Sequence, residues 1–175
     1  EYTNGAEIPL YAQYVAESYK YTFNLNDEAG STRASLVDTS IDHVEETFDN
    51  PYGSLFTVMA TRNGYDFKGW SLTKNGDVLT ADNLVALAQD TTVYAKWEPK
   101  SYNVTFVMKG SKMNLADTVP LASYDADKDT WTMQVKFDSQ VKFDKDKDVG
   151  ILPTPTKTDC RYLGWLADAK SWTEI

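Results

Sequence analysis

The residues with the most catalytic potential in this sequence are its single histidine, His43, and its single cysteine, Cys160. Together they could form a pair in which the imidazole acts as general base for a thiolate nucleophile. His43, however, lies in the acidic stretch SIDHVEET, which predicts an exposed surface histidine. The sequence contains no GxSxG, glycine-rich phosphate loop or HExxH motif. Paired carboxylates stay open as an acid–base alternative, but acidic residues occur throughout the chain, so we predict no enzyme.

Two runs of alternating aspartates have the spacing of a calcium-binding EF-hand loop. These runs are Asp125, Asp127 and Asp129, and Asp144, Asp146 and Asp148. Both lack the glycine at position six and the bidentate glutamate at position twelve that such a loop requires. Lys145 and Lys147 also cancel part of the charge of the second run. We interpret both runs as solvated loop tips and predict neither a metal nor a cofactor.

Aromatic side chains are a third chemical resource, at 13% of the residues. Exposed rings on a sheet could stack on sugar rings. The candidate ligand-binding residues are Tyr124, Trp131 and Trp172, because they lie outside the phrases that recur in the chain. Packing in a core or a crevice is the interpretation that we favour for them.

The overall composition excludes several classes of partner. The formal net charge of −9 argues against nucleic acid and against an anionic membrane surface. No apolar run reaches the length of a membrane span, so we predict no membrane insertion. One cysteine excludes an internal disulfide and fits an extracellular bacterial protein. The chain opens on EYTNGAEIPL, which indicates a piece of a longer protein.

Two phrases occur twice, in the same order. YAQYVAESYKYTF begins at Tyr11 and returns as YAKWEPKSYNVTF at Tyr94, 83 residues later. TRNGYDFKGW begins at Thr61 and returns as TKTDCRYLGW at Thr156, 95 residues later. The sequence is therefore a tandem repeat whose second copy carries about twelve extra residues.

Short aromatic and β-branched runs in these phrases predict strands at 19–23, 65–70 and 102–106, with an Asn-Gly turn before the second. Gly69, directly before a tryptophan, predicts a bulge or a close backbone approach. Alternating apolar residues also predict a strand over 131–137, which an Asp-Ser turn joins to a short strand at Val141 and Phe143. This elongated hairpin would hold the extra residues.

One helix is expected, in the stretch TADNLVALAQD over 80–90. Thr80 or Asp82 would cap it, and Leu84, Leu87 and Ala88 would face inward.

The order of these phrases resembles the Listeria–Bacteroides repeat, the B-repeat type of internalin B. Its parts are a YTVTF-like strand, a TRxGYxFxGW block and a YAKW-like closing strand. In the first copy they match Tyr21–Phe23, Thr61–Trp70 and Val93–Trp97, and in the second Tyr102–Phe106 and Pro155–Trp165. The resemblance implies an α+β, mostly β fold of tandem β-grasp-like units, each a small mixed sheet with one short helix.

The resemblance also implies a function. Such units occur in secreted or wall-attached bacterial proteins and are regarded as non-catalytic spacers or adhesive modules. We therefore expect an extracellular, cell-surface or cell-wall repeat module, whose partners would be a host or neighbouring-cell surface protein or a polysaccharide. A carbohydrate-binding module is the alternative function.

The positions of the phrases predict the domain boundaries. Unit 1 would cover 18–98, and unit 2 would cover 99–175 with the longer hairpin and no closing strand of its own. Residues 1–17 resemble a closing strand, from a preceding or a swapped unit. A boundary inside the repeat, or a degenerate last unit, explains this frame. The alternative is that residues 1–17 fill the vacant place in unit 2, in the same chain or by strand exchange with a neighbouring chain.

Overall fold

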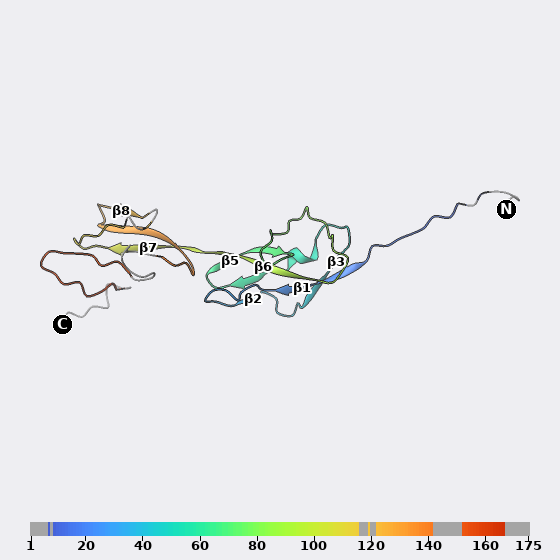
Figure 1. Cartoon of the computed structure of the whole chain (residues 1–175), viewed down its shortest axis with the longest axis horizontal. Coiled ribbons are helices and arrows are strands. Elements are labelled where there is room, and N and C mark those ends of the chain that lie inside the picture. The colour runs from blue at the N-terminus through green and yellow to red at the C-terminus, as the bar shows by residue number, and fades with distance from the viewer. Residues whose placement is uncertain (1–6, 8, 116–118, 120–121, 142–151, 167–175) are drawn as a thin grey trace. The chain divides into compact units, whose positions relative to one another are not determined.

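The computed structural model of the chain describes residues 7, 9–115, 119, 122–141 and 152–166. The chain forms two compact units, residues 1–98 and 99–175 (Figure 1). The strands of unit 1 are β1 (Ser18–Asn24), β2 (Ala34–Leu36), β3 (His43–Thr47), β4 (Ala60–Arg62), β5 (Tyr65–Ser71) and β6 (Thr91–Pro99). Those of unit 2 are β7 (Ser101–Val107), β8 (Ser123–Asp125) and β9 (Thr130–Lys136). One short 3-10 helix, η1 (Ser54–Thr57), is the single helical element among the described residues, so the fold is mostly β.

Unit 1 is built on a four-stranded sheet in the order β3-β1-β6-β5, and a two-stranded sheet pairs β2 with β4. β1 runs antiparallel to β3, with Tyr21 opposite Val44. It runs parallel to β6, with Phe23 opposite Val93. The strands predicted at 19–23 and 65–70 are thus confirmed as parts of β1 and β5. β6, which contains the YAKW phrase, lies between β1 and β5 in this sheet.

The aromatic residues of the repeated phrases form the core of unit 1. Trp70 is 1% exposed, and its indole N–H donates to the carbonyl oxygen of Val58 over 2.8 Å. Its ring lies 4.8 Å from Phe23 and 5.2 Å from Phe67, centroid to centroid. Phe67 in turn lies 5.4 Å from Trp97 of β6. The block that contains GYDFKGW therefore packs against the closing strand that contains YAKW.

Two charged side chains are buried in unit 1 and order its loops. Glu46 is 5% exposed, and its carboxylate accepts the backbone N–H groups of Gly53 and Leu55 over 3.1 and 2.5 Å. This carboxylate holds the start of η1 against β3. Arg62, also 5% exposed, donates to backbone carbonyls of the loop before β2, and its guanidinium lies 4.1 Å from the ring centroid of Tyr65.

The turn and the glycine predicted around β5 are both present. Asn63 and Gly64 form the turn between β4 and β5, and Gly64 has a φ of 80°. Gly69 has a φ of 129°, and a Cβ at this position would lie 2.7 Å from Val78. The neighbour at Gly69 is thus a side-chain methyl group of Val78 rather than the backbone that we predicted, and the positive φ is a second reason for glycine here.

The helix predicted over 80–90 is wrong. Residues 81–82 form a turn, Leu84 forms a β-bridge with Pro51, and no helical turn follows. Thr80 donates its hydroxyl and its N–H to the side-chain oxygen of Asn83, so it does not cap a helix. Asp82 lies in this turn and is followed by no helix, so it caps no helix either.

The inward-facing residues of this segment also differ from the expected ones. Leu84 is 49% exposed, Ala88 is exposed and Leu87 is half-buried. The fully buried residue is Val85, which exchanges backbone hydrogen bonds of 2.9 Å with Asn50 and Asp49. Pairing with this distant loop takes the backbone groups that a helix would use, and so overrides the local pattern.

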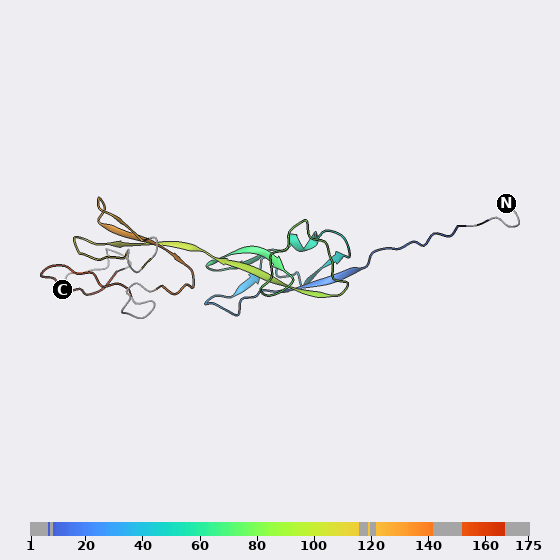
Figure 2. The ribbon, with the colours of Figure 1, turned by 45° about the horizontal axis from the view of Figure 1, so that its top comes forward.

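Unit 2 contains a three-stranded sheet in the order β7-β9-β8, in which all pairs are antiparallel. β7 and β9 lie side by side in both views (Figure 1, Figure 2). The strand predicted at 102–106 is confirmed by β7. The core of unit 2 comprises Phe106, Met108, Leu115, Val119 and Met133.

The predicted hairpin of unit 2 has a different partner strand. The strand expected over 131–137 is β9, but it pairs with β8, which precedes it. The carboxylate of Asp125 accepts the N–H groups of Asp127 and Lys128, and this closes the turn on that side. Val141 belongs to no strand, and Phe143 lies outside the described residues.

Replacing Glu46 with alanine should lower the free energy of unfolding of unit 1 by about 2–4 kcal/mol. The substitution removes the charged acceptor of the N–H groups of Gly53 and Leu55, and Leu55 is buried. Hydrogen exchange at these two amides, together with urea unfolding, measures the effect. Glu45→Ala is the matched control, because Glu45 is exposed on the same strand; its effect should stay within about 0.5 kcal/mol. Equal effects of both substitutions would refute this role of Glu46.

Candidate functional site

The predicted ligand-binding aromatics have different environments. Trp131 is half-buried in unit 2, and its indole N–H donates to the carbonyl of Met113 over 3.0 Å. Tyr124 is 48% exposed, and its ring lies 5.5 Å from that of Trp131, centroid to centroid. Trp172 lies outside the described residues. The structure therefore brings Tyr124 and Trp131 together, with Tyr124 the more exposed of the two.

The calcium candidate at 125–129 uses its carboxylates within the β8–β9 turn. Asp129 accepts the hydroxyl of Tyr124 over 2.7 Å and the N–H of Gly110 over 2.5 Å. The bond from Tyr124 and the bond from Gly110 both lower the pKa of Asp129. The bond between Tyr124 and Asp129 is also the main reason why the pKa of Tyr124 is raised. Asp125 bonds to the Lys128 ammonium over 2.9 Å, which lowers the pKa of its carboxyl group. The second run, 144–148, lies outside the described residues.

The two residues with nucleophilic or basic potential lie in different units. The imidazole of His43 is 32% exposed and bonds to the carboxylate of Asp42 over 2.7 Å. This bond lowers the pKa of Asp42. Cys160 is exposed in unit 2. Within the ranges that the structure describes, no three His, Cys, Asp or Glu residues lie close enough together to hold a metal ion.

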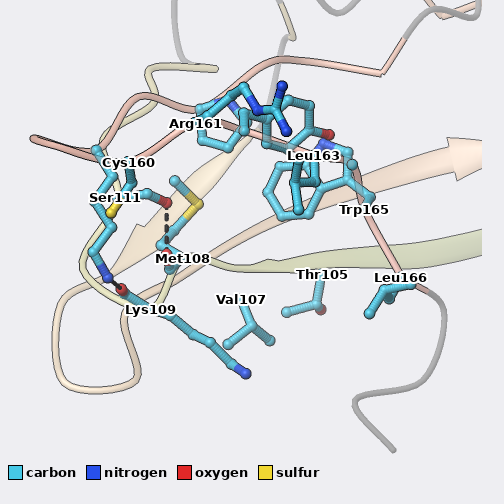
Figure 3. A pocket seen from close by; sticks show the side chains of 14 residues that line it. Thr105, Val107, Met108, Lys109, Ser111, Cys160, Arg161, Leu163, Trp165 and Leu166 are labelled. Atoms are coloured by element: carbon cyan, nitrogen blue, oxygen red, sulfur yellow. Dashed lines mark hydrogen bonds between the residues drawn. The ribbon is translucent and has the colours of Figure 1, made fainter. Parts of the chain in front are cut away.

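A groove of about 580 Å³ lies in unit 2 (Figure 3). One wall is β7, with Thr105 and Val107, and the other is the segment over 160–166. Figure 3 shows Trp165 and Leu163 on the side of the groove opposite Thr105 and Val107. Lys109 and Arg161 add positive charge to its lining. The groove is therefore long and mixed in polarity, with apolar walls.

The side chains beside this groove repeat the core geometry of unit 1. Trp165 lies 4.9 Å from Phe106, as Trp70 lies 4.8 Å from Phe23. Its indole N–H donates to the carbonyl of Pro153 over 2.6 Å, twelve residues upstream, at the same spacing as in the Trp70–Val58 bond.

The backbone repeats as well. Positive φ angles occur at Asn26 and at Lys109, 83 residues apart, and both are 49°. They also occur at Gly69 and at Gly164, 95 residues apart, at 129° and 151°. The segment over 160–166 of unit 2 therefore corresponds to β5 of unit 1, although no strand is assigned to it.

The groove lies where unit 1 has its closing strand. In unit 1, β6 separates β1 from β5, and both Val93 and Ala95 of β6 are fully buried. In the described part of unit 2, β7 pairs with β9 alone and is the edge of its sheet. A Cβ at Gly164 would meet no atom within 4 Å.

This arrangement suits recognition of a strand rather than catalysis. An open sheet edge presents backbone N–H and C=O groups in register, and alternate side chains of an added strand find apolar walls. Sequence reasoning did not predict a groove. The signal that points to it is the second TKTDCRYLGW block, whose Leu163 and Trp165 line the groove.

In the part of the chain that the structure describes, no helix is long and apolar enough to cross a membrane.

Comparison with known proteins gives a consistent result. The family model of the Listeria-Bacteroides repeat domain matches residues 19–96 and 121–175. A protein of Evansella cellulosilytica, which carries the provisional name of a Gly-rich membrane protein, is 29% identical over 119 residues. This match covers 66% of the present chain and 12% of that relative. No solved structure matches the chain significantly. Two matched segments in tandem, each containing the GW block and its packed tryptophan, show that the chain belongs to the Listeria-Bacteroides repeat domain family.

Proposed function

We propose that this chain is a non-catalytic, extracellular repeat segment of a bacterial surface or secreted protein, which spaces or presents other domains and offers an adhesive surface. The observation that carries the proposal is the match of one repeat family to two successive segments. A repeat that recurs in series suits a stalk, because length is gained by adding units. The partners would be surface proteins or polysaccharides of a host or a neighbouring cell.

Three further observations support this proposal. β6 ends at Pro99 and β7 begins at Ser101, so one residue, Lys100, joins the last strand of unit 1 to the first of unit 2. So short a connection suits a spacer, since it leaves little slack between units. The match covers 12% of a relative that is named as a membrane protein, which agrees with a repeat segment inside a much larger surface protein. The aromatic side chains of the repeated phrases are used for packing in the core of unit 1.

The second function, carbohydrate binding, is favoured by one observation. The Tyr124 ring is half exposed and is held against Trp131, while its hydroxyl is fixed by Asp129. A ring that is fixed before binding loses little freedom when it stacks on a sugar. This surface would make unit 2 the adhesive part of the module.

A spacer function predicts that the folded chain extends the reach of whatever follows it. An epitope displayed on a bacterial cell behind this chain should bind a full antibody better than an epitope attached directly to the anchor. A Gly/Ser linker of equal length should give a smaller gain, because a flexible chain spans less distance on average. Flow cytometry measures the antibody bound per cell, with a small epitope-binding tag as the expression control.

The fold dependence of this gain gives its control. Glu46→Ala should reduce the gain to the extent that it unfolds unit 1, and Glu45→Ala should leave it intact. If the wild-type chain, Glu46→Ala and Glu45→Ala all expose the epitope no better than direct attachment to the anchor does, the spacer function is wrong.

Carbohydrate binding through the Tyr124 surface predicts a separate outcome. Titration with bacterial and plant polysaccharides and mucin, followed by tryptophan fluorescence and pull-down, should show saturable binding. Tyr124→Ala should weaken it roughly tenfold while the chain stays folded at the assay temperature. Tyr102→Ala is the matched control, since Tyr102 is equally exposed, at 49%, on another strand of unit 2. Binding that survives Tyr124→Ala unchanged would exclude this surface.

A further inference from the structure

The half-exposed ring of Tyr124 in β8 is connected by hydrogen bonds to two lysines of unit 2. Its hydroxyl donates to Oδ1 of Asp129 over 2.7 Å, and Oδ2 of the same carboxylate accepts the N–H of Gly110 over 2.5 Å. The carbonyl oxygen of the same peptide group, that of Lys109, accepts the ammonium of Lys157 over 2.7 Å. The tyrosine ring and two lysines from separate segments therefore meet around one peptide group.

The position of this peptide group is fixed by its neighbours. The N–H of Met108, just before it, donates to the backbone carbonyl of Asp129 over 2.9 Å. Lys112, three residues after Lys109, exchanges backbone hydrogen bonds of 2.7 and 2.9 Å with Thr156, the residue before Lys157. The loop after β7 is thus held both by the β8–β9 turn and by the segment that contains Lys157. A site that is ordered before binding loses little conformational freedom when a ligand arrives.

Positive charge dominates this cluster. Lys109, Lys112 and Lys157 are all exposed, and they surround one carboxylate, that of Asp129. The bonds from Tyr124 and Gly110 and the nearby charge of Lys157 lower the pKa of Asp129, so this carboxylate stays ionised at neutral pH. Three ammonium groups against one carboxylate leave an excess of positive charge beside the ring.

The corresponding stretch of unit 1 carries the opposite charge. Lys109 stands 83 positions after Asn26, and both residues have a φ of 49°. The four residues that begin at Asn26 read Asn-Asp-Glu-Ala, whereas those that begin at Lys109 read Lys-Gly-Ser-Lys. Two acidic residues are thus exchanged for a stretch with two lysines. Because the repeat folds with either sequence, packing does not explain the lysines of unit 2.

The strand that carries the tyrosine also distinguishes the two units. In unit 1, β3 pairs antiparallel with β1 and is the edge of its sheet. In unit 2, β9 pairs antiparallel with β7 in the same way, and β8 is added on its outer side. The aromatic ring and the lysines are therefore two additions to the repeat, and they lie next to each other.

We propose that Tyr124, Lys109 and Lys157 form a binding site for an acidic polysaccharide, in which a sugar ring stacks on the tyrosine and a carboxylate of the sugar binds the ammonium groups. This inference rests on the proposed carbohydrate-binding function and narrows its ligand to sugars that carry negative charge. A lysine ammonium is a point charge, which suits an anion on a flexible sugar chain because it demands no planar two-bond geometry. A uronic acid has both features, a ring and a carboxylate attached to it.

The net charge of −9 does not oppose such a local site. At physiological ionic strength, exposed charges more than about 8 Å apart are largely screened from each other. The carboxylate of a bound sugar therefore responds mainly to the lysines next to it. A long polyanion would also meet the acidic surface of the rest of the chain, so we expect a site for a few sugar residues rather than an extended track.

The test uses short oligosaccharides that differ in charge. Tetrasaccharides from polygalacturonate, alginate and hyaluronate are titrated into the full chain by calorimetry, and at least one should show saturable binding. The fully methyl-esterified form of that tetrasaccharide, which keeps the rings and loses the charge, should bind at least about fivefold more weakly. Raising the salt concentration about tenfold should weaken binding of the acid and leave binding of the ester unchanged.

Variants of the lysines test the contacts. Lys109→Asn introduces the residue that unit 1 has at this position, where asparagine tolerates the φ of 49°, and should weaken binding of the acid about fivefold. Lys157→Gln should do the same, whereas Lys157→Arg keeps the charge, matches Arg62 of unit 1 and should bind nearly like wild type. Lys136→Gln is the matched control, because Lys136 is exposed at the opposite end of β9 from Asp129. Circular dichroism verifies that each variant is folded.

The outcomes separate this inference from the carbohydrate-binding function on which it rests. If the esters and neutral polysaccharides bind as tightly as the acids, and binding depends on Tyr124 but not on the lysines, carbohydrate binding stands and the acidic ligand is excluded. If no saccharide binds, both are wrong. Equal binding of tetraglutamate, which has carboxylates but no sugar ring, would also overturn the proposal. So would a loss of affinity in Lys136→Gln as large as that in Lys109→Asn.

Discussion

The architecture of unit 1 depends on one strand that pairs on both sides. β6 lies between β1 and β5, and its residues Val93 and Ala95 are fully buried. Burying one valine side chain contributes about 1.5–3 kcal/mol, but the larger contribution of β6 is geometric. It supplies backbone partners to two strands and positions Trp97 against Phe67. Trp70 also contacts Phe23 directly, so β6 adds to a contact between β5 and β1 that the aromatic rings already make.

The tryptophans of the GW blocks show how much of a unit can form without that strand. Trp165 keeps its ring contact with Phe106 and its indole bond to Pro153, although no strand is assigned around it. These contacts join the block over 160–166 to β7 through one side chain. Trp70, with the same contacts and β6 beside it, is 1% exposed, whereas Trp165 is only half-buried. The indole contact is therefore local, and its protection from water comes from the closing strand.

The parts of this fold that sequence reasoning predicted are those with short-range signals. Alternating aromatic and β-branched residues identified β1, β5 and β7, and repetition of whole phrases identified the family. Non-local pairing explains the errors. Leu84, Leu87 and Ala88 have helical spacing. Val85, however, donates its N–H to the carbonyl of Asn50 and accepts the N–H of Asp49, and this pairing prevents a helix. β8 has three residues, Ser-Tyr-Asp, whose sequence carries no strand pattern of its own. The groove depends on which strand is beside β7, and composition does not encode that.

The order of strands along the chain has a consequence for how such units close. β1 and β6 are neighbours in space and parallel, yet about seventy residues separate Phe23 from Val93. Pairing at such a separation costs more loop-closure entropy than the antiparallel β1–β3 contact, which closes a loop of about twenty residues, so we expect the β1–β6 pairing to form later. Until β6 arrives, the β1 edge is open. The groove beside β7 in unit 2 has the form of that open edge. A repeat whose closing strand comes last thus exposes an acceptor edge at each step, and a strand that continues directly into the next unit covers it.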